Sequence, residues 1–136
     1  QRVMAIAEEV AKEHLHQNAL EVSSRNFDVV QNYFSKLDFR PNVSSRFGSM
    51  DNLLGGRYCS IRNITAAQIR YQAKNTSDTL YQVSYDPEHF GQIPDISQGD
   101  TPLMRHVKGV QMEMWVEKGL LMVGAKDIPV TTNPTR

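Results

Sequence analysis

The spacing of the apolar residues changes near residue 42, and this change constrains the fold more than any other feature of the sequence. Within residues 3–16 apolar positions recur every three or four residues, which is typical of an amphipathic helix. Residues 26–37 repeat this spacing after a capping residue and before the helix-stopping pair Arg40-Pro41. Beyond Asn42 the spacing becomes two, which indicates strands. The order predicts an α+β fold, with two N-terminal helices packed on an antiparallel sheet of about five strands.

Alternating runs predict the strands of this sheet at residues 57–62, 67–71, 80–85, 110–117 and 120–126. The polar residues 74–78 make the second and third runs an antiparallel hairpin, and Lys118-Gly119 offers a two-residue turn between the last two runs. Residues 86–101 contain prolines and glycines among polar residues, so we expect a surface loop there. Residues 1–128 are predicted to form a single domain, and residues 129–136 a C-terminal tail.

Charge and cysteine content narrow the possible partners and sites. Fifteen Lys and Arg residues balance fifteen Asp and Glu residues, so no net field attracts nucleic acid, and we expect no nucleic-acid partner. Cys59 is the only cysteine, which excludes an internal disulfide and a thiolate-rich metal site. It lies in the run 57–62, where we interpret it as a small buried apolar residue.

Histidine and methionine side chains raise the question of a metal site. His14 and His16 stand two apart in the first helix, so they lie on nearly opposite faces and cannot easily chelate one ion. Thioethers and imidazole together suit Cu(I), which makes a periplasmic copper-binding module the alternative function. Its ligands would be Met104, His106, Met112 and Met114. Because Met112 and Met114 share a strand face with valines, core packing is the expectation, and we predict no metal and no cofactor.

Signals for catalysis are weak. The sequence contains no Gly-x-Ser-x-Gly turn, and the adjacent carboxylates of Glu8 and Glu9 diverge on a helix instead of forming an acid–base pair. An enzyme would require Glu88, His89 and His106 to converge from separate segments. We therefore expect a domain that binds and does not catalyse.

The last predicted hairpin is apolar on both faces. With Lys118-Gly119 as the turn, Trp115 lies opposite Met122 and shares one face with Met122 and Leu120. That face must be covered by the first helix, by the loop at 86–101, or by another molecule. Trp115, Leu120 and Met122 are therefore the candidate surface for a partner, including a second copy in a homodimer.

Two motifs stand close together in the middle of the chain. Residues 53–57 read Leu-Leu-Gly-Gly-Arg, and residues 66–71 read Ala-Ala-Gln-Ile-Arg-Tyr. Their characteristic positions are Leu54, Gly55, Gly56, Arg57, Ala66 and Ala67. Together with the helix at 26–37, these motifs resemble the extracytoplasmic domain of membrane-anchored anti-sigma factors, and the resemblance covers residues 14–85.

The resemblance implies a function and a location. In that family a cytoplasmic zinc-finger-like domain holds a sigma factor, one transmembrane helix follows, and a small outer domain carries these two motifs. For this chain it implies a non-catalytic sensory or regulatory domain on the periplasmic side of the inner membrane. It also implies a single membrane anchor just before Gln1, and a signal or protein partner bound by the outer domain.

Overall fold

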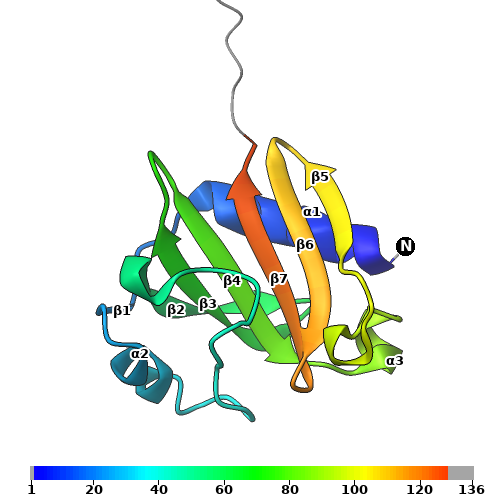
Figure 1. The fold of residues 1–136 in the computed structure, drawn as a ribbon, viewed down its shortest axis with the longest axis horizontal. Helices are drawn as coiled ribbons and strands as arrows, with labels where there is room; N and C mark the ends of the chain where they lie inside the picture. Colours follow the sequence, from blue (N-terminus) through cyan, green and yellow to red (C-terminus); the bar gives the residue numbers. More distant parts are fainter. Residues whose placement is uncertain (1, 129–136) are drawn as a thin grey trace, which may run out of the picture.

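The computed structural model of the chain describes residues 2–128 (Figure 1). Its helices are α1 (Arg2–His16), α2 (Phe27–Tyr33) and α3 (Pro87–Phe90), with short 3-10 turns at Met50–Asn52 and Ile96–Gln98. Its strands are β1 (Val22–Ser23), β2 (Leu53–Ile61), β3 (Ile64–Gln72), β4 (Ser77–Ser84), β5 (Leu103–Val107), β6 (Val110–Glu117) and β7 (Leu120–Asp127). They form one antiparallel sheet in the order β1-β2-β3-β4-β7-β6-β5. The tail expected at 129–136 lies outside the described residues.

The prediction of two helices on about five strands is wrong, although the α+β class is right. Within residues 2–128 the sheet has seven strands, and only α1 is a long helix. The second helix ends at Tyr33, because Phe34 leaves the helical conformation (φ −86°, ψ 52°) and buries its ring against the sheet. The two additional strands are β1, with two residues, and β5, where partly buried residues alternate with exposed ones.

Helix α1 crosses one face of the sheet, behind the strands in Figure 1. Its predicted apolar stripe is confirmed, because Val3, Ile6, Ala7, Val10 and Ala11 are all buried. They pack on side chains of the same sheet face, including Met112, Met114, Val116, Leu121 and Val123. Burial of this much apolar surface is what fixes the helix on the sheet.

The predicted register of the last hairpin is confirmed. Trp115 pairs with Met122, and Glu117 pairs with Leu120 across the Lys118-Gly119 turn. Both turn residues have positive φ, 54° and 77°, which matches the right-handed twist of a tight hairpin. Both faces of the hairpin are therefore apolar, as the alternation indicates, and each face belongs to a different apolar cluster.

Residues 34–52, called the strap below, cross the second face of the sheet in front of the strands in Figure 1. Under the strap and α2, Trp115 is 0%, Leu120 4% and Met122 0% exposed. Phe47 of the strap lies over the backbone of Gly124, where a Cβ atom would overlap its ring. The expected partner surface is thus corrected: the chain covers this face itself, with a segment that the sequence does not mark.

The outer edge of β2 is only partly covered by β1, which pairs with Gly55 and Gly56. Beyond β1, side-chain carboxylates take the main-chain donors. Glu21 Oε1 accepts the N–H of Tyr58 at 2.9 Å, and Glu9 Oε1 accepts the N–H of Arg62 at 2.9 Å. The pKa of Glu21 is lowered, chiefly by the hydrogen bond from the Tyr58 backbone.

Candidate functional site

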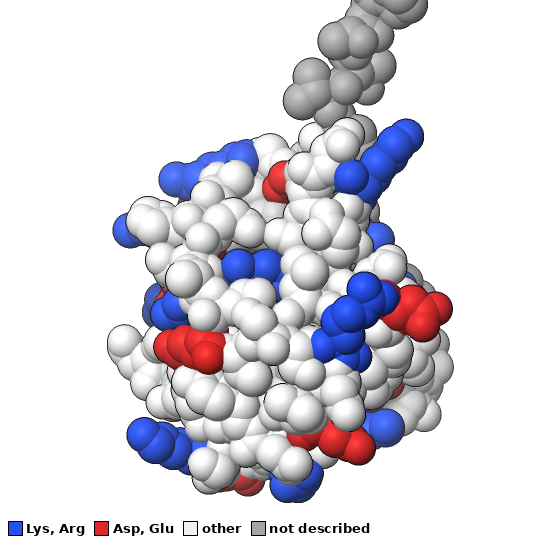
Figure 2. Space-filling model, turned by 90° about the vertical axis from the view of Figure 1, so that its left-hand side faces the viewer, with Lys and Arg blue, Asp and Glu red and all other residues white. Residues whose placement is uncertain are grey.

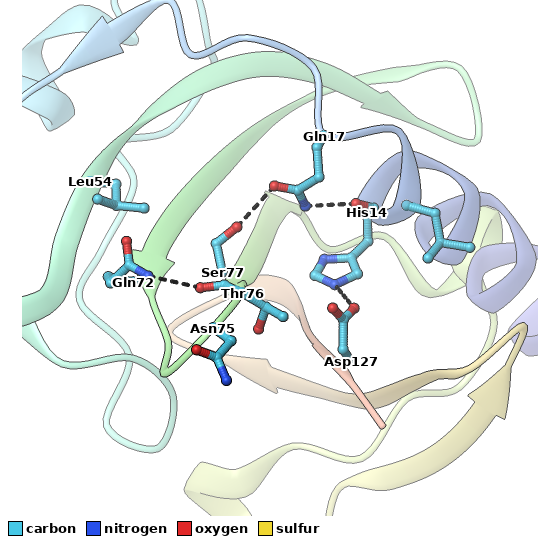
Figure 3. A pocket seen from close by; sticks show the side chains of 9 residues that line it. His14, Gln17, Leu54, Gln72, Asn75, Thr76, Ser77 and Asp127 are labelled. Atoms are coloured by element: carbon cyan, nitrogen blue, oxygen red, sulfur yellow. Dashed lines mark hydrogen bonds and ion pairs between the residues drawn. The ribbon is translucent and has the colours of Figure 1, made fainter. Parts of the chain in front are cut away.

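A polar hollow of about 400 Å³ opens where the last turn of α1 meets the β3–β4 turn and the end of β7 (Figure 3). Helix, hairpin and strand each supply part of its wall. Its lining residues are His14, Leu15, Gln17, Leu54, Gln72, Asn75, Thr76, Ser77 and Asp127. The volume is within the range of small-molecule sites, and amide, hydroxyl, imidazole and carboxylate groups dominate the lining.

His14 is the buried member of this site, with 2% of the residue exposed. Its Nδ1 lies 2.9 Å from Thr79 Oγ1 on β4, and its Nε2 lies 2.8 Å from Asp127 Oδ1 on β7. The Asp127 side chain is 41% exposed and faces the hollow (Figure 3). One imidazole thus connects α1 to two strands. His16 is exposed, so the predicted opposition of the two histidines is confirmed.

Thr79, His14 and Asp127 have the order of a hydroxyl–imidazole–carboxylate triad. In a triad enzyme the hydroxyl attacks the substrate while the imidazole takes its proton. Thr79 is only 1% exposed, between β3 and β7 in the sheet, so no substrate carbon reaches its hydroxyl in this arrangement. The arrangement positions α1 and does not supply a nucleophile.

Two amide side chains of the hollow, those of Gln17 and Gln72, are held by hydrogen bonds (Figure 3). Gln17 follows α1 with a positive φ of 48°, donates from Nε2 to the His14 carbonyl at 2.7 Å, and accepts from Ser77 Oγ at 2.9 Å. Gln72 Nε2 donates to the carbonyl oxygens of Ala73 and Thr76 at 2.7 and 3.1 Å. These bonds orient the amides before any ligand arrives, which lowers the entropy cost of binding.

Two carboxylates, Asp78 and Asp127, lie near His14 at this end of the sheet, and Lys126 lies near Asp78. Burial raises the pKa of Asp78, which precedes Thr79 on β4, and the charge of Asp127 adds to the rise while Lys126 and His14 oppose it. On the side of the molecule drawn in Figure 2, by contrast, Lys, Arg, Asp and Glu are interspersed without a continuous block of one sign. The balanced total charge therefore conceals a local carboxylate pair near His14.

The family-like motif residues surround the connection that follows α1. Gly55 has a φ of 150°, and a Cβ atom there would overlap the carbonyl oxygen of Val22. A Cβ atom on Gly56 would lie 2.9 Å from Gln68 O and 3.0 Å from the Phe34 ring. Both glycines thus let β1 and α2 approach β2 closely. Leu54, at the bulge before Gly55, lines the hollow.

Arg57 holds the connection between α1 and β1, and together with the two glycines it forms what is called the clamp below. Its Nη1 donates to the Ala19 carbonyl at 2.6 Å, and its Nη2 lies 3.8 Å from Glu21 Oε2. Ala66 and Ala67 of the second motif face opposite sides of the sheet, one in each apolar cluster. The two motifs therefore have structural roles that join α1, the connection after it and the sheet.

The strap is fastened by a buried carboxylate. Glu117 is 6% exposed and accepts from Trp115 Nε1, Ser44 Oγ and the Ser45 N–H, each at 3.0 Å. Burial alone would raise the pKa of Glu117, but these hydrogen bonds outweigh it and hold the pKa below its ordinary value. A second fastening pairs the buried Gln82 amide with the backbone N–H and C=O of Asn42, at 2.9 and 2.7 Å.

The predicted copper ligands do not converge. Met112 and Met114 are fully buried beneath α1. Met104 and His106 are exposed on β5 and pair with Glu113 and Gln111, so they alternate away from the face that holds the buried methionines. In the described part of the chain, no three His, Cys, Asp or Glu side chains gather as a metal site would require.

No hydrogen bond joins the side chains of Glu88, His89 and His106 within residues 2–128. His89 Nε2 contacts the Arg62 carbonyl at 2.8 Å, and the Glu88 carbonyl accepts from Arg2. Cys59 is partly buried and packs against the α1 cluster, as expected for a small apolar residue. Burial, aided by the charge of Glu13, raises the pKa of its thiol, so the thiolate is suppressed.

Comparisons with known proteins add nothing that identifies the chain. No protein family, curated protein or solved structure matches it. Among the helices of residues 2–128, none has the length and apolar character that a bilayer crossing requires.

Sequence reasoning missed the role of His14. The only available signal was a polar side chain inside the apolar stripe of α1, at a position that must face the sheet. Its partners Thr79 and Asp127 lie 65 and 113 residues away, so no local pattern connects them.

Proposed function

We propose that this chain is a non-catalytic sensory domain, and that it forms the periplasmic part of an anti-sigma-factor-like membrane regulator. A polar ligand or partner enters the hollow beside His14 and changes how α1 sits on the sheet. The observation that carries the proposal is the His14 imidazole, which joins α1 to Thr79 and Asp127 in the wall of the hollow. An occupant of the hollow competes for Asp127 and so acts on the helix.

The clamp formed by the family-like motifs supports this coupling. Arg57 holds the connection after α1 at Ala19, and Arg70 Nη2 donates to the carbonyl of Asn18 at 2.7 Å. The connection is therefore fixed to β2 and β3, while the end of α1 depends on His14 and Gln17. Ligand binding is thereby directed into movement of α1 and not of the segment that follows it.

The membrane anchor is part of the proposal and has its own test. If α1 continues a transmembrane helix, the gene encodes an apolar segment of about twenty residues just before residue 1. A start codon directly before residue 1, without such a segment, contradicts the anchor.

Hydrogen exchange of the amides in the last turn of α1 tests the coupling. Replacing Asp127 with alanine removes one hydrogen bond of His14, and we expect these amides to exchange about tenfold faster, since such a bond is worth about 1.4 kcal/mol. Asn75→Ala is the matched control, because Asn75 lines the same hollow without a hydrogen bond to α1. Equal exchange rates in the two variants would contradict coupling through His14.

A further inference from the structure

The hollow beside His14 continues into a second one of about 460 Å³. Leu54 and Gln72 line both, and Figure 3 shows them on the side of the first hollow away from His14 and Asp127. The second hollow is lined further by Ser23, Ser24, Arg25, Asp51, Asn52 and Leu53. The two hollows adjoin at Leu54 and Gln72, beside the end of β3, and together they are called the end groove below.

Four side-chain amides and four side-chain hydroxyls stand among the residues that line the end groove, beside apolar surface that is larger in the second hollow. Asn75 and Asn52 each present a donor and an acceptor on one planar group, the same pair that a peptide unit presents. After their bonds within the domain, Gln72 keeps its Oε1 acceptor and Gln17 keeps one N–H donor. Leu54, at the junction of the two hollows, offers an apolar contact between these amides. None of the described residues that line the groove is Phe, Tyr or Trp, and the His14 ring is buried, so a nucleobase finds no open stacking platform there.

The two ends of the groove carry opposite groups. At one end the Asp127 carboxylate uses Oδ1 for His14, and its side chain is 41% exposed. At the other end Arg25 Nη2 donates to the Asp51 carbonyl at 2.7 Å, and the acidic residue Asp51 also lines this end, without an ion pair to Arg25 among the described residues. A ligand with an amine at one terminus and a carboxylate at the other matches this polarity.

We propose that the end groove binds a short extended peptide, with its amino terminus at Asp127 and its carboxyl terminus at Arg25. The peptide's main-chain groups pair with the amides of the groove floor, and small side chains suffice because no deep side-chain pocket is needed. The inference rests on the proposed sensory function and names the class of its ligand. An amine that binds Asp127 competes with His14, which connects the peptide to α1.

Tetra-alanine peptides test the proposal, with free ends, with an acetylated amino end, or with an amidated carboxyl end. We expect the free peptide to shift the NMR signals of the Gln72 and Asn75 side-chain amides. Acetylation of the amino end should weaken binding about threefold to fivefold in the wild type but not in Asp127→Asn. Amidation of the carboxyl end should weaken binding by a similar factor in the wild type but not in Arg25→Ala. Arg40→Ala, outside the groove, should leave all three affinities unchanged.

Three results would overturn the peptide assignment. They are an absence of groove shifts with millimolar free peptide, an acetylation effect that persists in Asp127→Asn, and groove shifts caused by a neutral disaccharide but not by the peptide. Exchange of the α1 amides separates this inference from the proposed function. Peptide binding without a change in α1 exchange refutes the sensory coupling alone, while a change in α1 exchange caused by the disaccharide but not by the peptide refutes the peptide alone.

Discussion

Replacing Glu117 with alanine is expected to loosen the strap and to destabilise the domain by about 3 kcal/mol. The Glu117 carboxylate accepts hydrogen bonds from the Trp115 ring, the Ser44 hydroxyl and the Ser45 backbone. Alanine removes the acceptor for all three donors at once. Two of them, the indole N–H and the Ser44 hydroxyl, belong to buried residues.

The magnitude follows from these donors. A buried donor left without an acceptor costs about 1–3 kcal/mol, and the indole N–H of Trp115 has no route to water while the strap is closed. The partly buried Ser45 N–H and the hydroxyl of Ser44 regain water as the strap lifts, so they add less. For a domain of this length, about 3 kcal/mol corresponds to a melting temperature lower by roughly 10 °C.

Trp115 fluorescence is the natural assay, because Trp115 is the only tryptophan of the chain. In Glu117→Ala we expect emission at longer wavelength and stronger quenching by acrylamide below the melting temperature, as water reaches the indole. Glu113→Ala is the matched control on the same strand. Glu113 pairs with Arg46 of the strap at 3.0 Å, but both side chains are partly exposed, so its loss should cost less than about 1 kcal/mol.

Two results would refute this reasoning. If Glu117→Ala loses less than about 1 kcal/mol, the buried carboxylate does not hold the strap. If Glu113→Ala and Glu117→Ala raise acrylamide quenching equally, the surface ion pair and not the buried network determines access to the indole.

Three further predictions concern other features of the fold. Gly55→Ala should lower the free energy of unfolding in urea by more than about 2 kcal/mol, because its Cβ atom would overlap the Val22 carbonyl. Gly99→Ala should lower it by only about 1 kcal/mol, because its Cβ atom meets no neighbour and only the positive φ is unfavourable. Cys59 should react with a disulfide reagent at pH 8 far more slowly than a free thiol, because burial raises its pKa; reaction at the free-thiol rate would contradict its burial. Because the pKa of Glu117 is lowered in the folded state, its contribution to stability is present above the ordinary carboxyl pKa and is lost as pH falls through the lowered value. The stability difference between wild type and Glu117→Gln, from urea unfolding across pH, should therefore shrink on acidification; a constant difference would contradict this.

Apolar spacing predicts α1 and the β6–β7 hairpin well, because in both elements burial alone decides which side chains face the sheet. The two missed strands lack that signal. β1 is only two residues long, and β5 is an edge strand whose inward residues are merely half-buried. Phe34 explains the early end of α2: its place in the apolar stripe suits a helix, but its ring is needed beside Gly56, which helical continuation does not allow.

The strap and the hollow could not be predicted for a different reason. The strap is irregular, so no period marks it, and its course is set by Ser44 and Asn42 meeting residues on β6 and β4 far along the chain. The hollow likewise depends on Asp127 reaching His14 across the whole domain. The copper hypothesis failed because it grouped residues by their closeness in sequence. Strand pairing places Met104 and Met112 on different faces of the sheet.

The carboxylates along the outer edge of β2 have a consequence for solubility. An open strand edge recruits other chains into intermolecular sheets, and here Glu21 withholds the Tyr58 N–H from such pairing most strongly while it is ionised. Its lowered pKa keeps this protection in place through mild acidification. Strong acid removes it, and the domain should then self-associate through β2 at a pH where its core is still folded, which light scattering alongside circular dichroism would detect. A chain with no net charge at neutral pH has little overall repulsion to keep it dispersed, so local cover of this edge by Glu21 and Glu9 matters more.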